Sequence, residues 1–432
     1  MQLIIHRGTQ EIGGSCVELS TEKSQILIDF GMPLVNDKKE PFNSRILTNK
    51  SIDDLKKLKI LPDIKGLYRG EEKAIDGILI SHSHMDHYGF LSYVNPDIPI
   101  YMSEGAKILV EISNMFIPHK IGKLNVKTID KIKSFAIGEF KIESYLVDHS
   151  AFDARAFLIE AEGKRIFYSG DFRGHGRKNI LFDRMISNPP KNIDCLLMEG
   201  SMLGRSKQVY KDENAVQKRI EEILRDSPNM NFLFVSSQNI DRLVSAYKAC
   251  LKTGHIFVID LYTAYILDKL RKVSKNIPQF NWRNIRVKFI KSHADALAER
   301  VSQKLLYFYN TKKIDMFEIN RKKNKILMLA RDNSVFPILV KGIKGAGGAN
   351  IIYSMWGGYL TDKFKDYCDK KRLAIEQVHT SGHAIVEDLK AFAEAINPKM
   401  LIPIHTFAAQ KYPKFFKNTR ILQDKEVLDM NL

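Results

Sequence analysis

The sequence predicts an α/β protein in which one α/β domain is inserted into another. Three observations support this fold class. The first 200 residues contain mostly short strands, helices and strands alternate from Asp212 onward, and the positive charge is concentrated inside this second region. A chain of 432 residues is long enough for two or three domains.

Short runs rich in apolar and β-branched residues predict the strands of the first region. These runs are Cys16–Leu19, Gln25–Phe30, Gly77–Ser81, Phe140–Val147, Ala156–Glu160, Arg165–Ser169 and Cys195–Met198. A helical pattern covers Glu104–Met115, with Ser103 as the expected N-cap, and a further helix is expected after His87. Residues 31–76 show little pattern, and long connections of this kind often form lids.

The second region alternates between helices and strands, which is typical of a parallel sheet. Its expected elements are helix Asp212–Arg225, strand Phe232–Val235, helix Asp241–Leu251, strand Ile256–Ile259 and helix Tyr262–Val273. After Tyr353 the expected elements are strand Ile375–Val378, helix Ile385–Ala395 and strand Met400–Pro403.

The net charge of +17 lies almost entirely in residues 201–350, which carry 28 Lys and Arg against 13 Asp and Glu. Residues 1–200 carry 27 of each and are neutral. A single Lys/Arg run is usually a solvated face. An asymmetry over 150 residues instead suggests a surface that faces a polyanion such as nucleic acid.

The composition also excludes several classes of protein. A hydrophobic fraction of 44% is too high for a disordered chain. No apolar run approaches the length that spans a bilayer, so no membrane partner is expected. The four cysteines are scattered without a CxxC pair, which suits a reducing compartment and predicts a cytoplasmic location.

The strongest chemical signal is the heptapeptide SHSHMDH at residues 81–87, directly after an apolar strand. Residues two apart at a strand end point to the same side, so His82 and His84 can share one metal ion. The following turn can direct Asp86 and His87 at a second ion. Such a density of imidazole and carboxylate ligands suits Zn²⁺, with Mn²⁺ or Fe²⁺ as weaker alternatives.

This HxHxDH motif resembles that of the metallo-β-lactamase fold superfamily, whose fold is an αββα sandwich. Three further residues at expected strand ends match the superfamily pattern. Asp29, in QILIDFG, matches an aspartate that orients metal ligands. His149, in LVDHSAFD, matches the third histidine of the first zinc site, and Asp171, in YSGDFR, matches the carboxylate that bridges both metals.

The later motifs resemble the β-CASP branch, which includes ribonuclease J and the endonuclease of pre-mRNA 3′-end cleavage. They are Glu199 in LLMEGS, His383 in HTSGHA and His405 in PIHT. In that branch the last position is His in RNA-processing members and typically Val in DNA-repair members, so His405 favours RNA. The resemblance extends from Gly13 to about His405.

The resemblance implies a domain organisation and a set of roles. Residues 1–205 and 375–432 are expected to form the metallo-β-lactamase domain, and residues 206–374 the inserted β-CASP domain. Two Zn²⁺ per chain are implied, with Mn²⁺ as an alternative. The first is held by His82, His84 and His149, the second by Asp86, His87 and His405, with Asp171 bridging. Asp86 is expected to orient the hydroxide, His383 to contact the scissile phosphate, and Glu199 to orient His383.

Residues 236–242, SSQNIDR, resemble the strand–loop–helix through which the insert of this branch reaches the substrate backbone. Hydroxyl, amide and guanidinium groups at a helix N-terminus make a phosphate cradle, although an ordinary helix cap explains them equally well. The expected RNA contacts are Ser236, Ser237, Asn239, Arg242, Ser381 and Gly382. Trp356 is expected to be buried, with base stacking as the alternative.

These features predict a zinc-dependent ribonuclease that hydrolyses RNA phosphodiester bonds through a two-metal-activated hydroxide, in exo mode, endo mode or both. Single-stranded RNA is the expected substrate. A DNA nuclease of the same branch is the first alternative, followed by a catalytically silent RNA-binding subunit and a small-molecule hydrolase. Because the sequence stops near Leu432, the C-terminal domain of ribonuclease J is not expected. The oligomeric state stays open, with a homodimer as one option.

Overall fold

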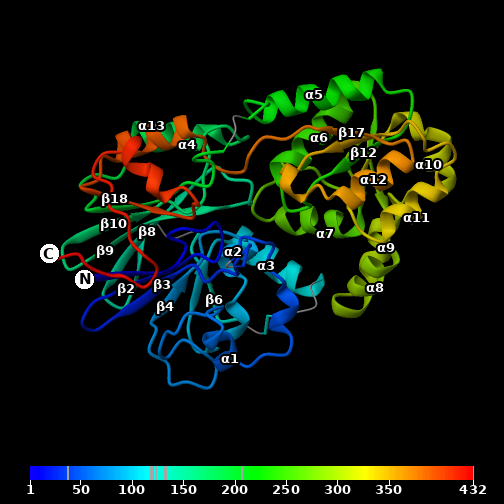
Figure 1. Cartoon of the computed structure of the whole chain (residues 1–432). Coiled ribbons are helices and arrows are strands. Elements are labelled where there is room, and N and C mark those ends of the chain that lie inside the picture. Colours follow the sequence, from blue (N-terminus) through cyan, green and yellow to red (C-terminus); the bar gives the residue numbers. More distant parts are fainter. Residues whose placement is uncertain (37, 117–120, 123, 131–133, 206–207, 432) are drawn as a thin grey trace. The chain divides into compact units, whose positions relative to one another are not determined.

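The protein is described by a computed structural model that covers residues 1–36, 38–116, 121–122, 124–130, 134–205 and 208–431. The chain divides into two compact units (Figure 1). The sandwich unit comprises Met1–Gly174, Lys178–Ser206 and Gly382–Leu432. The inserted unit comprises His175–Arg177 and Lys207–Ser381.

Two mixed sheets form the centre of the sandwich unit. The first has the strand order β19-β1-β2-β3-β4-β5-β6 and the second β18-β11-β10-β9-β8-β7. The strands of the first sheet are β1 Gln2–Arg7, β2 Cys16–Ser20, β3 Gln25–Ile28, β4 Gly77–Leu79, β5 Ile100–Met102, β6 Val126–Thr128 and β19 Val427–Asp429. Those of the second are β7 Ser134–Ile137, β8 Phe140–Leu146, β9 Arg155–Ala161, β10 Lys164–Tyr168, β11 Cys195–Glu199 and β18 Met400–Ile404.

Alternation of side chains along the strands builds two separate apolar layers. In β9, Phe157 and Ile159 join the core between the sheets, whereas Ala156 and Leu158 face the helices outside. The other strands of the second sheet follow the same period of two, which sends successive side chains to opposite faces. Each large apolar side chain buried in this way stabilises the fold by about 1.5–3 kcal/mol.

Helices cover the outer faces of both sheets, so the predicted αββα sandwich is confirmed. The first sheet packs against α1 and α3, and the second against α4 and α13 (Figure 1). The helices of this unit are α1 Ile52–Lys57, α2 Met85–Tyr88, α3 Glu104–Phe116, α4 Asn179–Ser187 and α13 Val386–Ile396, with 3-10 turns η1 Ser44–Leu47, η2 Leu91–Tyr93 and η5 Ala409–Lys414.

Residues 55–67 of the segment 31–76 belong to the core and do not form the expected lid. Its residues Leu55, Leu61, Ile64 and Leu67 are almost completely buried in the core on the outer face of the first sheet. Leucine and isoleucine are spaced irregularly here, so the sequence shows no period although the side chains are part of the core.

The inserted unit is a six-stranded sheet in which every neighbouring pair is parallel, in the order β14-β13-β15-β12-β16-β17. Its strands are β12 Asn231–Phe234, β13 Ile256–Asp260, β14 Ile285–Lys288, β15 Ile326–Ala330, β16 Asn350–Tyr353 and β17 Ala374–Gln377. Its helices are α5 Glu213–Asp226, α6 Ile240–Thr253, α7 Leu261–Leu270, α8 Lys291–Arg300, α9 Lys304–Asn310, α10 Met316–Lys322, α11 Val335–Gly342 and α12 Asp362–Lys370, with 3-10 turns η3 Lys323–Lys325 and η4 Gly357–Tyr359.

One expected boundary is wrong. The strand expected at Ile375–Val378 in the return segment is β17, which pairs with β16 in the inserted sheet, and the sandwich unit resumes only at Gly382. Strand pattern alone does not state which sheet a strand joins, because pairing is a long-range choice.

None of the helices within the described residues is long and apolar enough to cross a membrane.

Candidate metal centre

The second sheet of the sandwich unit places four predicted site residues at the carboxyl ends of its strands. Strands β8, β10, β11 and β18 run in the same direction. Their carboxyl ends therefore lie together. His149 and Asp171 follow β8 and β10, Glu199 ends β11, and His405 follows β18.

The first sheet supplies the remaining ligands. Asp29 follows β3, and residues 82–87 follow the adjacent parallel strand β4 and lead into α2. Backbone N–H groups of Phe30 and Met32 donate to the carbonyl oxygens of His87 and Met85, at 2.8 and 3.0 Å. A Cβ at Gly31 would lie 1.7 Å from the Asp86 carbonyl oxygen, so only glycine allows this close approach.

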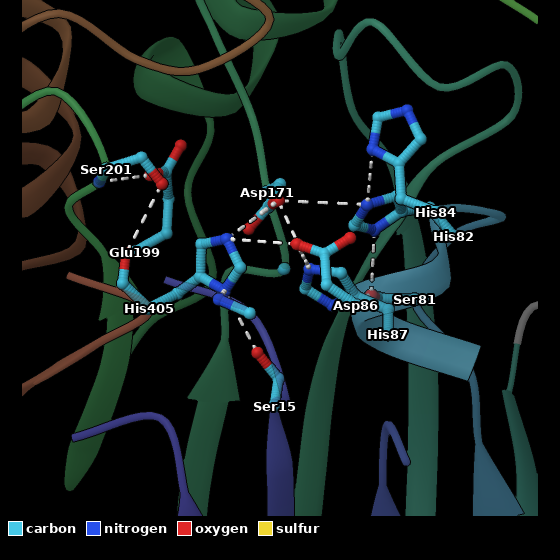
Figure 2. A network of polar contacts seen from close by, with 12 residues as sticks. Ser15, Ser81, His82, His84, Asp86, His87, Asp171, Glu199, Ser201 and His405 are labelled. Carbon is cyan, nitrogen blue, oxygen red and sulfur yellow. Dashed lines mark hydrogen bonds and ion pairs between the residues drawn. The ribbon is translucent and has the colours of Figure 1, made fainter. Parts of the chain in front are cut away.

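Two groups of side chains match the two expected metal sites (Figure 2). In the first, His84 Nδ1 lies 3.2 Å from Nε2 of both His82 and His149. In the second, Asp86 Oδ2 lies 3.8 Å from His87 Nε2 and 3.6 Å from His405 Nε2. Within each group the candidate ligand atoms all lie within 4.8 Å of one another.

Asp171 lies between the two groups. Its Oδ2 is 3.7 Å from His82 Nε2 in the first group, and 3.2 and 3.6 Å from Nε2 of His87 and His405 in the second. Asp171 is 2% exposed, and within the described residues neither of its carboxylate oxygens has a hydrogen-bond partner. A buried carboxylate without donors is costly. Among the described residues, Nε2 of His87 and Nε2 of His405 also have no hydrogen-bond partner. The residues present therefore fit bound metal cations.

The electrostatics of the first group also suit metal binding. Burial lowers the pKa of His84 to about 4 and holds the pKa values of His82 and His149 well below their usual range. These imidazoles are therefore neutral near pH 7, which is the form that ligates metals.

In the second group, burial lowers the pKa of His405, whereas His87 stands in a strongly negative field. Burial opposes protonation of His87, but Asp171, Asp29 and Asp86 raise its pKa well above the usual value. Burial likewise opposes ionisation of Asp171, but His405, His87 and His383 hold its pKa well below the usual range. The field that favours a proton on His87 is equally favourable to a metal cation.

Hydrogen bonds to the other ring nitrogens orient the histidines. Asp29 Oδ2 accepts from His87 Nδ1 and from the Tyr168 hydroxyl, both at 2.7 Å, and from the Ser81 hydroxyl at 2.8 Å. His149 Nδ1 lies 2.5 Å from the Gly382 carbonyl oxygen, to which it donates. These contacts leave Nε2 of both rings available for a metal.

Sequence reasoning predicted Asp29 but missed Ser15, Ser81 and Tyr168. The Ser15 hydroxyl lies 3.0 Å from His405 Nδ1 (Figure 2). Ser81 and Tyr168 each stand at a strand end just before a ligand segment, and this position is the only signal that could have indicated them.

His383 lies beside Asp171 and Glu199. Its Nδ1 is 3.4 Å from Glu199 Oε1 and 3.6 Å from Asp171 Oδ2. Burial opposes protonation of His383, but Glu199 and Asp171 raise its pKa above the usual value. Glu199 also accepts from the backbone N–H groups of Ser201 and Ala384, at 2.9 and 3.3 Å. The His383 imidazole is thus held next to the candidate metal ligands by a fixed carboxylate.

Comparison with known families agrees with this centre. Residues 44–233 match the beta-lactamase superfamily domain, and residues 370–411 match the Zn-dependent metallo-hydrolase RNA specificity domain. The chain is thus similar to the metallo-β-lactamase superfamily, and to its ribonuclease J members, in these two segments.

Two bacterial proteins called ribonuclease J are similar to most of the chain. It is 24% identical over 410 residues to ribonuclease J of Helicobacter pylori, covering 92% of this chain and 55% of that protein. It is 23% identical over 429 residues to ribonuclease J of Mycoplasma genitalium, covering 92% and 66%. The chain thus spans about half the length of the first of these relatives. A protein of unknown function from Enterococcus faecalis has the same fold, with a TM-score of 0.79, 21% identity and 99% of both chains covered.

One of the expected phosphate contacts is wrong. Arg242 is fully buried, and its guanidinium donates to Glu213 and to the carbonyl oxygens of Ser354 and Thr380. It has no surface with which to contact RNA. Ser237 is also buried and bonded to the Thr263 hydroxyl at 2.6 Å.

The other expected phosphate contacts have mixed environments. Ser236 is exposed, and Asn239 caps α6 by accepting from the Arg242 backbone N–H at 3.1 Å. Ser381 is 8% exposed, and its backbone N–H donates to Gln208 at 2.8 Å. Gly382 holds His149 through its carbonyl oxygen.

Proposed function

We propose that this chain is a metal-dependent ribonuclease that hydrolyses phosphodiester bonds in single-stranded RNA. The observation that carries the proposal is the Asp171 carboxylate, which lies buried between two groups of histidine and aspartate ligands and, among the described residues, has no hydrogen-bond donor. The relatives named above, called ribonuclease J, and the match to an RNA specificity domain support RNA as the substrate.

We assign two Zn²⁺ ions to the centre. His82, His84 and His149 would hold the first and Asp86, His87 and His405 the second, with Asp171 contacting both. Mn²⁺ is the alternative, because both ions accept imidazole and carboxylate ligands. When bound there, two such ions would lower the pKa of a water nucleophile and neutralise charge on the phosphate oxygens.

Asp86 is suited to orient the attacking water. It is 7% exposed and lies at the second metal group, with its Oδ2 near both His87 and His405. Because a carboxylate accepts hydrogen bonds, Asp86 can hold a water proton while the water oxygen faces the phosphorus.

His383 is suited to donate a hydrogen bond or a proton to the scissile phosphate. Its side chain is 23% exposed, more than Asp171 and Glu199, and its raised pKa favours the protonated ring. Glu199 fixes the ring and favours its charge, so Glu199 is a positioning residue.

The phosphate backbone would be bound by the inserted unit. Residues 201–350 carry 28 Lys and Arg against 13 Asp and Glu, and such a surface binds a polyanion. Ser236, Asn239 and Ser381 remain candidate phosphate contacts. Arg242 is excluded from this set by its burial.

End-labelled RNA tests the proposal. The purified chain is incubated with one labelled RNA that carries a 5′-monophosphate, 5′-triphosphate or 5′-hydroxyl, and with the matching single-stranded DNA. Metal-dependent cleavage of RNA is expected, together with its loss in EDTA and in the double variant Asp86→Ala, His87→Ala. The product ladder reports exo or endo cleavage. Full activity of the double variant would show that the site assignment is wrong, and preference for DNA would favour a DNA nuclease.

A further inference from the structure

Trp356 and Tyr359 form an exposed aromatic pair in the loop after β16 of the inserted unit. Trp356 is 49% exposed and Tyr359 is 59% exposed. Their ring centroids lie 5.2 Å apart and their planes meet at 90°. The expectation that Trp356 is buried is therefore wrong. The alternative, that its ring stacks on a base, depends on the groups that surround the ring.

The loop holds the indole in one place. A Cβ at Gly358 would come within 2.2 Å of the indole, so the ring lies directly over the Gly358 backbone. The Tyr359 backbone N–H donates to the Trp356 carbonyl at 3.1 Å, and the Gln377 amide donates to the Met355 carbonyl at 3.0 Å. Glycine is needed at 358 because any larger residue would displace the indole. A ring fixed in this way loses little conformational entropy when a ligand stacks on it.

The pair follows the carboxyl end of a strand, and α/β proteins bind ligands at this end of the sheet. All six strands are parallel, so the residues that follow β12, β15 and β16 emerge at the same edge. Ser236 follows β12 and is exposed, and Arg331 follows β15. Ligands of open parallel sheets bind outside the carboxyl ends of the strands. The exposed Ser236 and the Arg331 guanidinium, which is ion-paired with Asp260, therefore share this end of the sheet with the two aromatic rings.

The positive charge of the inserted unit and the small area of the aromatic pair favour a nucleic acid over a protein partner. The inserted unit contains most of the net positive charge of the chain, and aromatic side chains in basic proteins stack on the bases of single strands. A stable protein interface buries about 800 Å² on each partner, far more than two rings provide.

We propose that Trp356 and Tyr359 form a stacking platform for an unpaired base of single-stranded RNA. Trp356 provides the stacking surface, and Tyr359 and Gly358 hold the indole in place. The proposal takes its substrate class from the ribonuclease function proposed above. It adds a contact to a base, whereas the metal centre and the basic residues contact only the phosphate backbone.

Tryptophan fluorescence tests the contact directly, because the chain has only two tryptophans. In the Trp282→Phe variant, Trp356 is the single emitter. A 12-nucleotide oligoadenylate with phosphorothioate linkages should quench this emission. An abasic strand of the same length and charge should not. The Trp356→Phe variant, in which Trp282 emits, should show no quenching by either strand. Equal quenching of Trp356 by both strands, or none, would overturn the platform.

Binding measured by fluorescence anisotropy gives the second test. Trp356→Ala should raise the Kd for oligoadenylate about tenfold and leave the Kd for the abasic strand unchanged. Gly358→Ala should weaken binding in the same direction by displacing the indole. Phe317→Ala removes a 76% exposed aromatic from α10 of the same unit and should change nothing.

The two proposals fail in different ways. Quenching of Trp356 without any RNA cleavage would overturn the ribonuclease function and leave the platform standing. Cleavage with a Trp356→Ala Kd within twofold of the original would overturn the platform alone. If Trp356→Ala leaves RNA binding intact but abolishes self-association in sedimentation, the pair is a protein contact and the platform is wrong.

Discussion

Arg242 and Glu213 form a fully buried, bidentate ion pair in the inserted unit. Arg242 Nε lies 3.0 Å from Glu213 Oε2, and Nη2 lies 2.9 Å from Oε1. The same guanidinium donates to the carbonyl oxygens of Ser354 and Thr380, both at 3.2 Å. One side chain of α6 therefore ties together α5 and the segments that follow β16 and β17.

Arg242→Ala should lower the free energy of unfolding of the inserted unit by about 3–5 kcal/mol, because it leaves the Glu213 carboxylate buried without its partner. Chemical denaturation measures this loss. Ser236→Ala changes an exposed residue of the preceding loop and should alter stability by no more than about 0.5 kcal/mol. Arg242→Ala with unchanged stability but weaker RNA binding would instead support a phosphate contact.

Asp171→Asn should reduce the affinity of the centre for metal by more than about 100-fold, because it removes the charge that faces both ligand groups. Metal content per chain after dialysis, measured by mass spectrometry, checks this. Asp194→Asn is the matched control, since Asp194 pairs with Lys399 at 2.8 Å and contacts none of the candidate ligands that the structure describes. Full metal content in Asp171→Asn would refute the role given to Asp171.

Asp29→Asn should weaken metal binding by about 10–100-fold. The Asp29 carboxylate is not one of the proposed ligands, but it accepts the hydrogen bond from His87 Nδ1 that orients this ligand. Tyr168→Phe removes one of the donors to Asp29 and should have a smaller effect in the same direction. Competition with a chelating dye measures both affinities. Equal effects of the two variants would contradict the importance of the Asp29–His87 contact.

RNA binding should weaken steeply as the salt concentration rises, with a slope of about 0.7 for each phosphate contact made by a single strand. Charge reversal at Arg321 and Lys325, which are exposed residues of the basic region, should make this slope shallower. The same reversal at Lys57 and Lys73, exposed in the neutral first region, should leave the slope unchanged. Equal losses from both pairs would disprove the location of the RNA surface.

The stability of the inserted unit should depend on pH through Asp260. Burial opposes ionisation of this carboxyl, but Arg331 and His293 lower its pKa below the usual value. Because the pKa is depressed in the folded state, its stabilisation is fully present above the unfolded value of about 3.9 and is lost as the pH falls through the folded value.

Asp260→Asn should therefore be less stable than the original chain near pH 7, and the difference should shrink below about pH 4. Denaturation curves across this range measure it. A difference that stays constant down to pH 2 would show that Asp260 does not act through its charge.

Much of the site could be predicted because its signals are local. The HxHxDH motif places four metal-binding side chains within six residues, directly after a strand. The end of that strand can be recognised from a few neighbouring residues. His149, Asp171 and His405 were recognisable because each stands shortly after an apolar strand and matches a motif of the family that the chain resembles. The structure brings all of these residues together.

The sequence by itself determined the types of ligand, their order and the division of the chain into a strand-rich and an alternating region. The tertiary structure alone decided which polar residues are buried and which are exposed. Arg242 looked like a phosphate contact and is enclosed, whereas Trp356 was expected inside and is half exposed. Burial depends on segments distant in the chain, such as β17 joining the inserted sheet, and those long-range contacts leave no mark in the local pattern.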